Sequence, residues 1–421
     1  MERVEEDAAV VIVGAGIAGL STSLALHRLG VESVVLERAD SLRAAGFGIG
    51  LWNNAWIPLD ALGIAQSLRH KHPPLTGLVT LSIASGLTTS DKPYTAIHHK
   101  GGLESRCVNR KVLLETLENQ LPKGTIRYSS KVVRIQEEQE QETTHGRHAC
   151  TLKSIHLSDG TILKAKVLIG CDGVNSMVAK YLGFNKPSSV GRWVARGIAY
   201  YENGHGFEPK SLHFFGEGVK YGIVPCDHNS LYWFFAYIPS PQEQGIEENP
   251  AKLKQFILSN LGKVSDRIIK VFQGTHLTNI VCSEIRTRHP WELLWGNISK
   301  GNVCVAGDAL HPMTPEMGQG ACAALESSIV LARALAGAMK ERTLGDDSLE
   351  NELQRIHKGL EKYADERRWR SINLITASWI FGQMQKGNGA VISFLRGKIM
   401  AKFLARLMLK MASFDCGPLQ A

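Results

Sequence analysis

An apolar run followed at once by three spaced glycines sets the strongest constraint on this chain. Ala8–Val13 contains no charged residue, which is typical of a strand buried on both faces of a parallel sheet. Gly14, Gly16 and Gly19 follow it, and residues 20–29 then carry apolar side chains at helical spacing. A glycine turn between a buried strand and a helix is typical of a dinucleotide-binding fold.

Each glycine of this turn has a physical role. Gly14 allows the tight turn, Gly16 lets the backbone approach a pyrophosphate, and Gly19 lets the helix pack closely on the strand. A second strand is expected over residues 31–36, and Glu37 at its end can accept hydrogen bonds from both hydroxyls of an adenosine ribose. The motif does not distinguish NAD from FAD, although Glu37 disfavours NADP. A purely structural glycine turn is the alternative.

A second glycine-rich segment lies between an expected strand at 303–306 and a long expected helix at 319–340. Asp308 stands at the carboxyl end of that strand, where it can hold ribityl or ribose hydroxyls. Gly318 and Gly320 place bare backbone N–H groups at the start of the helix, which suits an anion or a ring oxygen that becomes anionic on reduction. An ordinary helix start after a proline-rich loop is the alternative.

These segments resemble one known family when they are taken in order. The glycine turn, the Asp172–Gly173 pair after a short buried strand, and the segment 307–320 resemble the class A flavoprotein monooxygenases, the para-hydroxybenzoate hydroxylase-like family. The sequence of segment 311–326 is most similar to that of the plant-type FAD monooxygenases, relatives of zeaxanthin epoxidase. The resemblance covers roughly residues 8–385.

The resemblance implies a set of cofactor contacts. The three glycines would hold the FAD pyrophosphate, and Glu37 the adenosine ribose with Arg38 beside it. Further implied contacts are Arg110 on an expected helix over 110–121, the backbone of Val133 near the adenine, Asp172 and Gly173 near the pyrophosphates, Asp308 at the ribityl chain, and Gly318 and Gly320 at the flavin pyrimidine edge. Because only one glycine fingerprint is present, NADPH or NADH is expected to bind transiently.

The same resemblance implies the chemistry. Reduced FAD and O2 form a C4a-hydroperoxide, which hydroxylates or epoxidises a small hydrophobic aromatic or alkenyl metabolite, and no protein nucleophile is needed. The sequence offers no metal-ligand spacing. Lys220 and Tyr232, polar residues on otherwise apolar expected strands, can hydrogen-bond a substrate oxygen, and the carbonyl of Pro315 would pass the reactive face of the flavin. A solvent-facing lysine and a sheet-face tyrosine are the alternatives.

Aromatic residues mark a separate substrate region. Of the 30 aromatic residues, 12 lie between Trp193 and Tyr237, which predicts a sheet with one aromatic face. The expected fold is α/β, with a Rossmann-like FAD-binding domain (1–189 and 286–345), an inserted mixed β-sheet substrate domain (190–285) and a C-terminal helical cap (346–421). Within the first domain, residues 126–135 and 150–157 are expected to pair as a hairpin.

Composition indicates where in the cell the protein is expected to act. The eight cysteines never form C-x-x-C, the start of the chain is acidic, and no charge-free stretch of about 18 apolar residues occurs. We therefore expect a reduced cytoplasmic protein without a membrane span. The net charge of +8 arises mainly in residues 366–421, so it says little about nucleic acid. The basic amphipathic stretch 391–412 favours packing over the active site above contact with a membrane surface.

Two other functions stay open at this point. A flavin-dependent dehydrogenase or reductase on the same fold would consume nicotinamide without incorporating oxygen. A non-catalytic FAD- or NAD-binding scaffold would use the aromatic sheet to hold a partner. The sequence does not address the oligomeric state.

Overall fold

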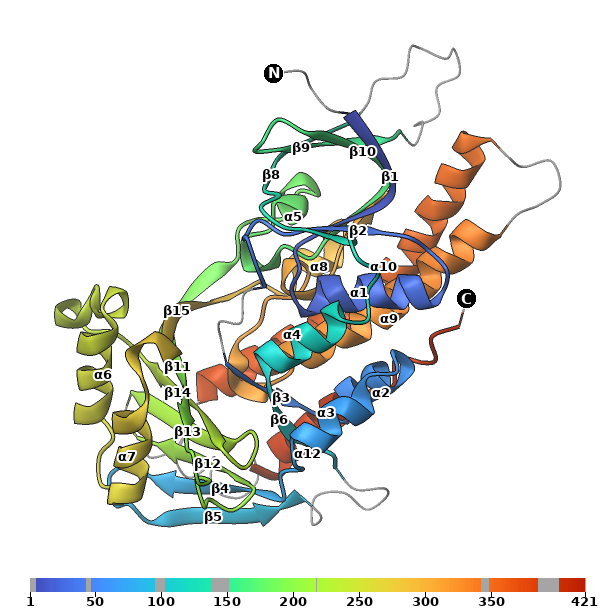
Figure 1. Ribbon diagram of the computed structural model, residues 1–421. Helices are drawn as coiled ribbons and strands as arrows, with labels where there is room; N and C mark the ends of the chain where they lie inside the picture. Colours follow the sequence, from blue (N-terminus) through green and yellow to red (C-terminus); the bar gives the residue numbers. More distant parts are fainter. Residues whose placement is uncertain are drawn as a thin grey trace.

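The chain folds around two large β-sheets with helices packed against them (Figure 1). The structure is a computed structural model that describes residues 5–42, 47–94, 103–137, 151–216, 218–341, 348–384 and 401–420, the side chains of 384 and 401–406 excepted. The helices are α1 (Ile17–Arg28), α2 (Asn53–Ala61), α3 (Ala65–Lys71), α4 (Arg110–Glu118), α5 (Met177–Tyr181), α6 (Pro250–Ser259), α7 (Asp266–Gly274), α8 (Glu292–Trp295), α9 (Gly320–Lys340), α10 (Leu349–Met384) and α12 (Ala401–Ala412).

The first sheet has eight strands and a parallel centre. Its main order is β16 (Ser299–Lys300), β17 (Val303–Val305), β10 (Ile162–Gly170), β1 (Glu5–Val13), β2 (Val34–Leu36) and β7 (Ile126–Arg127), with β8 (Val132–Glu137) and β9 (Lys153–Leu157) attached beside β10. β1 runs parallel to β10 and β2, and β10 runs parallel to β17. Val10, Val11 and Ile12 are fully buried, as a strand covered on both faces requires.

The expected hairpin is confirmed only in part. β8 pairs antiparallel with β9, but β7 pairs parallel with β2, so residues 126–135 do not form one strand. The reason is a turn in which Ser129 has a φ of +54° and the Ser130 amide donates to the Glu37 carbonyl oxygen at 2.8 Å. The polar connection expected between the hairpin strands falls largely at 138–150, outside the described residues.

The second sheet has seven strands and carries the aromatic region. Its order is β15 (Ile280–Thr287), β11 (Ser188–Tyr200), β14 (Ser230–Tyr237), β13 (Val219–Pro225), β12 (Lys210–Phe215), β4 (Gly77–Ser82) and β5 (Thr88–Pro93). β4 and β5 therefore join this sheet from within residues 1–189. In the sequence, β4 and β5 lie between the glycine-rich β3 (Gly48–Leu51) and its antiparallel partner β6 (Arg106–Asn109), and the other strands of this sheet follow β6.

The aromatic side chains are divided between the two faces of this sheet. Trp233, Phe235 and Tyr237 are buried in a cluster beneath α6 and α7, which cover one face (Figure 1). Tyr232 and Phe234 point to the opposite face, because successive residues of a strand alternate. The bulk of the aromatic surface thus forms a core under α6 and α7, and only part of it faces the first sheet, contrary to the single aromatic face expected.

α9 is the central helix of the protein, and it contacts both α1 and α10. It is long and apolar enough to cross a membrane by length and composition, yet 78% of its most apolar window is buried inside the fold. Of the amphipathic tail, Leu407 and Met411 pack with Met317, which lies just before α9, and Lys410 is exposed. Residues 391–400 of that tail lie outside the described residues.

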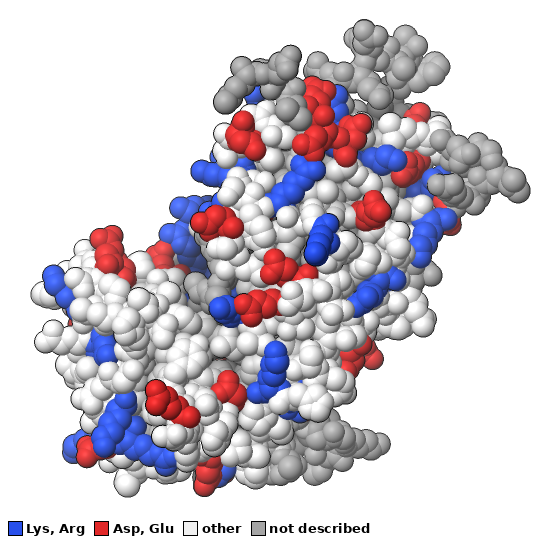
Figure 2. Space-filling model, viewed as in Figure 1, with Lys and Arg blue, Asp and Glu red and all other residues white. Residues whose placement is uncertain are grey.

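Charge of both signs is spread over the surface. On the face in Figure 2, Lys and Arg side chains are interspersed with Asp and Glu. Such mixing leaves no broad field of one sign on this face, since neighbouring opposite charges cancel at a distance.

A buried ion cluster joins α9, α10 and the C-terminal segment. The Glu326 carboxylate receives hydrogen bonds from Arg370 and Asn54 and forms an ion pair with Arg367 at 2.9 Å. The Arg370 guanidinium also donates to the Met411 carbonyl oxygen at 2.7 Å. Because Glu326 and Arg367 are fully buried, water does not solvate either charge, and each depends on its protein partners.

We expect Glu326→Ala to lower the free energy of unfolding by about 3–5 kcal/mol, since it leaves two buried arginines without their carboxylate. Urea unfolding of the purified protein measures the change. The control is Glu366→Ala, which breaks a partly exposed pair with Arg333 and should cost at most about 1 kcal/mol. Equal costs for the two variants would contradict the role of the cluster.

Candidate cofactor and substrate site

Four parallel strands end at one edge of the first sheet, and the predicted cofactor residues follow directly from them. Gly14 follows β1, Glu37 follows β2, Asp172 comes two residues after β10, and Asp308 comes three residues after β17. This is the edge at which open parallel sheets bind ligands. The Glu37 carboxylate accepts hydrogen bonds from the Ala15 amide at 3.0 Å and the Ala39 amide at 2.9 Å, which fixes it beside the glycine turn.

Close backbone packing explains two of the three glycines of the turn. Gly14 has a φ of +103°, and a Cβ there would lie 2.5 Å from the carbonyl oxygen of Cys171. A Cβ at Gly19 would overlap the carbonyl oxygen of Gly14. Side chains at these positions would push α1 and β10 away from β1.

Gly16 is different, because a Cβ there would meet nothing within 4 Å. Gly16 is the N-cap of α1, no side chain caps that end, and the first turn holds no acidic residue. Open space in front of unshared N–H groups at a helix N-terminus fits a pyrophosphate. The residues present therefore fit the dinucleotide cofactor that the sequence predicts.

The surroundings of Asp308 point to a recess at this edge of the sheet. Its side chain is exposed to solvent, yet burial raises the pKa of its carboxyl, against the lowering effect of Arg110 and Arg196. A group that solvent reaches while protein surrounds it is expected to line a cleft, and we use that name for the recess at Asp308. Burial likewise lowers the pKa of Arg110, against the attraction of Asp308. The expected contacts Asp308 and Arg110 thus face the same cleft.

The start of α9 borders the cleft and brings in a residue that the sequence did not reveal. Gly318 has a φ of +60°, and a Cβ there would lie 3.4 Å from Nε1 of Trp52. That indole N–H is buried and has no hydrogen-bond partner among the described residues. Gly320 lies next to Asp308, with its Cβ position 4.0 Å from the Asp308 Oδ1. An unsatisfied donor beside bare backbone suits an acceptor edge of a bound ring.

Other predicted cofactor residues have different surroundings. The Asp172 carboxylate accepts hydrogen bonds from the Met177 amide at 2.7 Å and from the Ser176 hydroxyl, so it caps α5. The backbone of Cys171 and Asp172 adjoins the glycine turn at Gly14. Arg38 is exposed at the end of β2. Val133 is 46% exposed at a bulge of β8.

Two of the predicted substrate contacts share one face of the second sheet. The ring of Tyr232 packs directly on the backbone of Gly48 in β3. The Lys220 ammonium lies 5.2 Å from the ring centre of Phe215 and 5.8 Å from that of Phe234. Burial lowers the pKa of Lys220 to about 8 and raises the pKa of Tyr232 to about 12.

Pro315, the third predicted substrate contact, is exposed on the loop before α9. The neighbouring Glu316 forms a buried ion pair with Arg192 of β11, which attaches this loop to the second sheet. Glu316 also acts electrostatically on Lys220, so the loop and Lys220 lie close together.

Arg196 is a further residue that the sequence analysis missed. It stands on β11 opposite Phe234 and donates to the Ser283 hydroxyl at 3.2 Å. Its charge also opposes the rise that burial causes in the pKa values of Asp308 and Tyr232. It therefore connects the cofactor side of the cleft with the substrate side. An arginine inside an aromatic strand was the signal available in the sequence.

Comparison with known proteins agrees with this geometry. The family described as "FAD binding domain" matches residues 7–352. The chain belongs to the FAD-binding monooxygenase family. It is 46% identical to "Monooxygenase 2" of Arabidopsis thaliana over 413 residues, which cover 97% of this chain and 98% of that protein. It is 36% identical to "Monooxygenase 1" of the same plant over 98% of this chain and all of that protein.

The fold comparison extends the match to solved structures. Klebsiella pneumoniae HpxO, determined in complex with FAD and uric acid, superposes with a TM-score of 0.78 at 20% identity, covering 98% of each chain. The predicted α/β fold, the FAD cofactor and the oxidoreductase activity as a monooxygenase are thus confirmed. The class A flavoprotein resemblance is confirmed at this level, whereas the individual site residues stay predictions.

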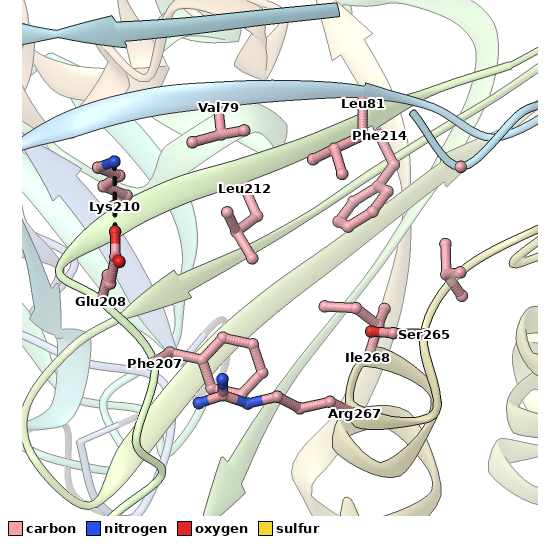
Figure 3. A pocket seen from close by; sticks show the side chains of 12 residues that line it. Val79, Leu81, Phe207, Glu208, Lys210, Leu212, Phe214, Ser265, Arg267 and Ile268 are labelled. Atoms are coloured by element: carbon pink, nitrogen blue, oxygen red, sulfur yellow. Dashed lines mark ion pairs between the residues drawn. The ribbon is translucent and has the colours of Figure 1, made fainter. Parts of the chain in front are cut away.

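A separate cavity of about 360 Å³ lies on the other face of the second sheet (Figure 3). Val79, Leu212 and Phe214 line it together with Ile268 of α7 and Phe207, whose ring stacks under the Arg267 guanidinium at 3.9 Å. These strand residues alternate with those facing the cleft, so the sheet separates this cavity from Tyr232. The predicted substrate residues Lys220 and Tyr232 therefore do not line this cavity.

We expect Gly16→Ala to weaken FAD binding at least tenfold, about 1.4 kcal/mol, because its methyl group enters the space in front of α1. The fold should persist, since nothing else touches that position. Gly19→Ala is the contrasting variant and should reduce the yield of folded protein. Titration of the apoprotein with FAD, followed by flavin fluorescence, measures the affinity. An unchanged affinity of Gly16→Ala would contradict the prediction that the FAD pyrophosphate binds at this turn.

Proposed function

We propose that this monooxygenase uses NADPH or NADH with O2 to hydroxylate or epoxidise a small aromatic or alkenyl compound that carries an acidic oxygen. The observation that carries the proposal is the position of Lys220. Its ammonium lies between two aromatic rings, and no hydrogen bond or ion pair to it is found among the described residues. A cation in such surroundings gains most from an anionic ligand.

The residues of the cleft divide the work between cofactor and substrate. The bound FAD supplies the activation of O2 after reduction by the nicotinamide. Asp308, Arg110 and the glycine turn would hold this cofactor. Lys220 would bind the acidic oxygen of the substrate, and the Tyr232 hydroxyl, which burial keeps protonated, would donate a hydrogen bond to a substrate oxygen.

The aromatic face of the sheet supports the proposed orientation. Phe215 and Phe234 flank Lys220 and would stack against a flat apolar substrate while excluding water. The His213 ring meets Phe234 edge-on with ring centres 5.4 Å apart, and burial lowers the pKa of His213 to about 3. The imidazole is therefore neutral and adds no charge beside Lys220.

Finer assignments stay predictions. They are the relationship to zeaxanthin epoxidase, the choice between NADH and NADPH, the cytoplasmic location and a membrane contact of the C-terminal helix. The curated relatives named monooxygenases favour oxygen transfer over the alternative of a reductase.

Incorporation of labelled oxygen decides between these two functions. The purified holoprotein would be incubated with NADPH or NADH, ¹⁸O2 and a panel of phenols, aromatic acids and terpenoid acids. We expect one ¹⁸O atom in the product of at least one acidic substrate, with nicotinamide consumption in equal amount. Nicotinamide oxidation that leaves every substrate unlabelled, with all the oxygen recovered as peroxide, would support the reductase.

Lys220 should set the pH dependence of substrate binding. Its amine is charged below its pKa of about 8 and loses its proton above it, so KM for an acidic substrate should rise as the pH increases through 8. Lys220→Met should raise KM at least tenfold, about 1.4 kcal/mol, and remove this rise. Lys220→Arg should move the rise to higher pH, since arginine stays charged.

The matched control is Lys210→Met on the neighbouring strand β12, where the ammonium pairs with Asp91 and Glu208 at the surface. Steady-state kinetics between pH 6 and about 9.5 should show no change in KM for this variant. If Lys220→Met behaves like Lys210→Met, the substrate does not use an anionic group at this position.

A further inference from the structure

Two cysteines from distant parts of the chain meet beside the cleft. Cys107 lies in β6, and Cys226 follows β13 directly. Their sulfur atoms are 2.9 Å apart across 119 positions of sequence, and both residues are at most 1% exposed. Trp52 and Tyr232 pack around the pair, which places it next to the predicted substrate contact.

This sulfur–sulfur contact is distinctive among the described cysteines. The sulfurs of a disulfide are about 2.0 Å apart, so a combined movement of less than about 1 Å would bring Cys107 and Cys226 to bonding distance. Cys171, directly after β10, and Cys304, within β17, are also buried close to each other. No contact between their sulfurs is found in the described part of the chain.

We propose that Cys107 and Cys226 form a peroxide-sensitive dithiol that closes to a reversible disulfide. One thiolate attacks H2O2, which cleaves the O–O bond and leaves a sulfenic acid and one water molecule. The second thiol then displaces a second water from that sulfur, and the S–S bond forms. Two thiols and one H2O2 thus give one disulfide and two waters: the sulfurs lose two electrons and the peroxide gains them.

A disulfide between Cys107 and Cys226 would link the two sides of the cleft. β6 leads directly to Arg110 at the start of α4, on the cofactor side of the cleft. Cys226 stands in the turn between β13 and β14, with its amide bonded to the Ser230 carbonyl oxygen at 3.0 Å, on the substrate side. The disulfide would fasten these two sides together. Peroxide is available here, because a reduced flavin that passes two electrons to O2 without oxygen transfer yields H2O2.

The test uses the full-length holoprotein, reduced and then titrated with H2O2. Peptide mapping without reductant should show the peptide with Cys107 linked to that with Cys226, lighter by two hydrogens and separated again by dithiothreitol. The Tm should rise on oxidation, because the bond closes a long loop in the unfolded chain. Burial raises the pKa of the Cys107 thiol, so linkage should accelerate with increasing pH.

Three variants make the result specific. Cys107→Ala and Cys226→Ala should each lose the linked peptide and the rise in Tm, and their flavin absorbance shows whether they still fold. Cys304→Ala, which removes a buried thiol from β17, should behave like the natural protein. The proposal is overturned if peroxide leaves both thiols free for alkylation after unfolding, or if it oxidises either one only to sulfinic or sulfonic acid.

Discussion

The contact between the glycine turn and the end of β10 is the constraint on which the rest of the site depends. Gly14 lies so close to the Cys171 carbonyl, and Gly19 so close to the Gly14 carbonyl, that only hydrogen atoms fit there. This packing brings the carboxyl ends of β1, β2, β10 and β17 to one edge. It also aims the uncapped first turn of α1 at the space where the FAD phosphates fit.

The second sheet depends on this arrangement for its function. Its strong core lies under α6 and α7, where Trp233, Phe235 and Tyr237 are buried. That core leaves the opposite face free to carry Lys220, Arg196 and Tyr232 toward the cofactor edge. The Arg192–Glu316 ion pair and the packing of Tyr232 on Gly48 hold the two parts in register. The positions of Lys220 and Arg196 in the cleft thus depend on the apolar core under α6 and α7, which fixes the sheet that carries them.

The Cys107–Cys226 contact lies on the same boundary between the two sheets. Neither cysteine belongs to a motif; Cys107 is a buried residue of β6, and Cys226 is a buried residue of the turn after β13. Their proximity arises because β6 is attached to the cofactor side and the β13–β14 turn to the substrate side. A disulfide at this boundary would restrict the movement of the cofactor side relative to the substrate side.

Local patterns in the sequence were sufficient for the parallel strand β1, the glycine turn, the FAD cofactor and the long helix α9, because each depends on neighbouring residues with a fixed period or conformation. The hairpin was predicted only in part, since the turn at Ser129 interrupts what reads as one apolar strand. The capping role of Asp172, the unsatisfied Trp52 indole, the recess around Asp308 and the meeting of Arg196 with Tyr232 were decided by the tertiary structure. Each of these joins residues from separate strands or loops, and only the packing of the two sheets fixes which side chains lose contact with water and which charges face one another.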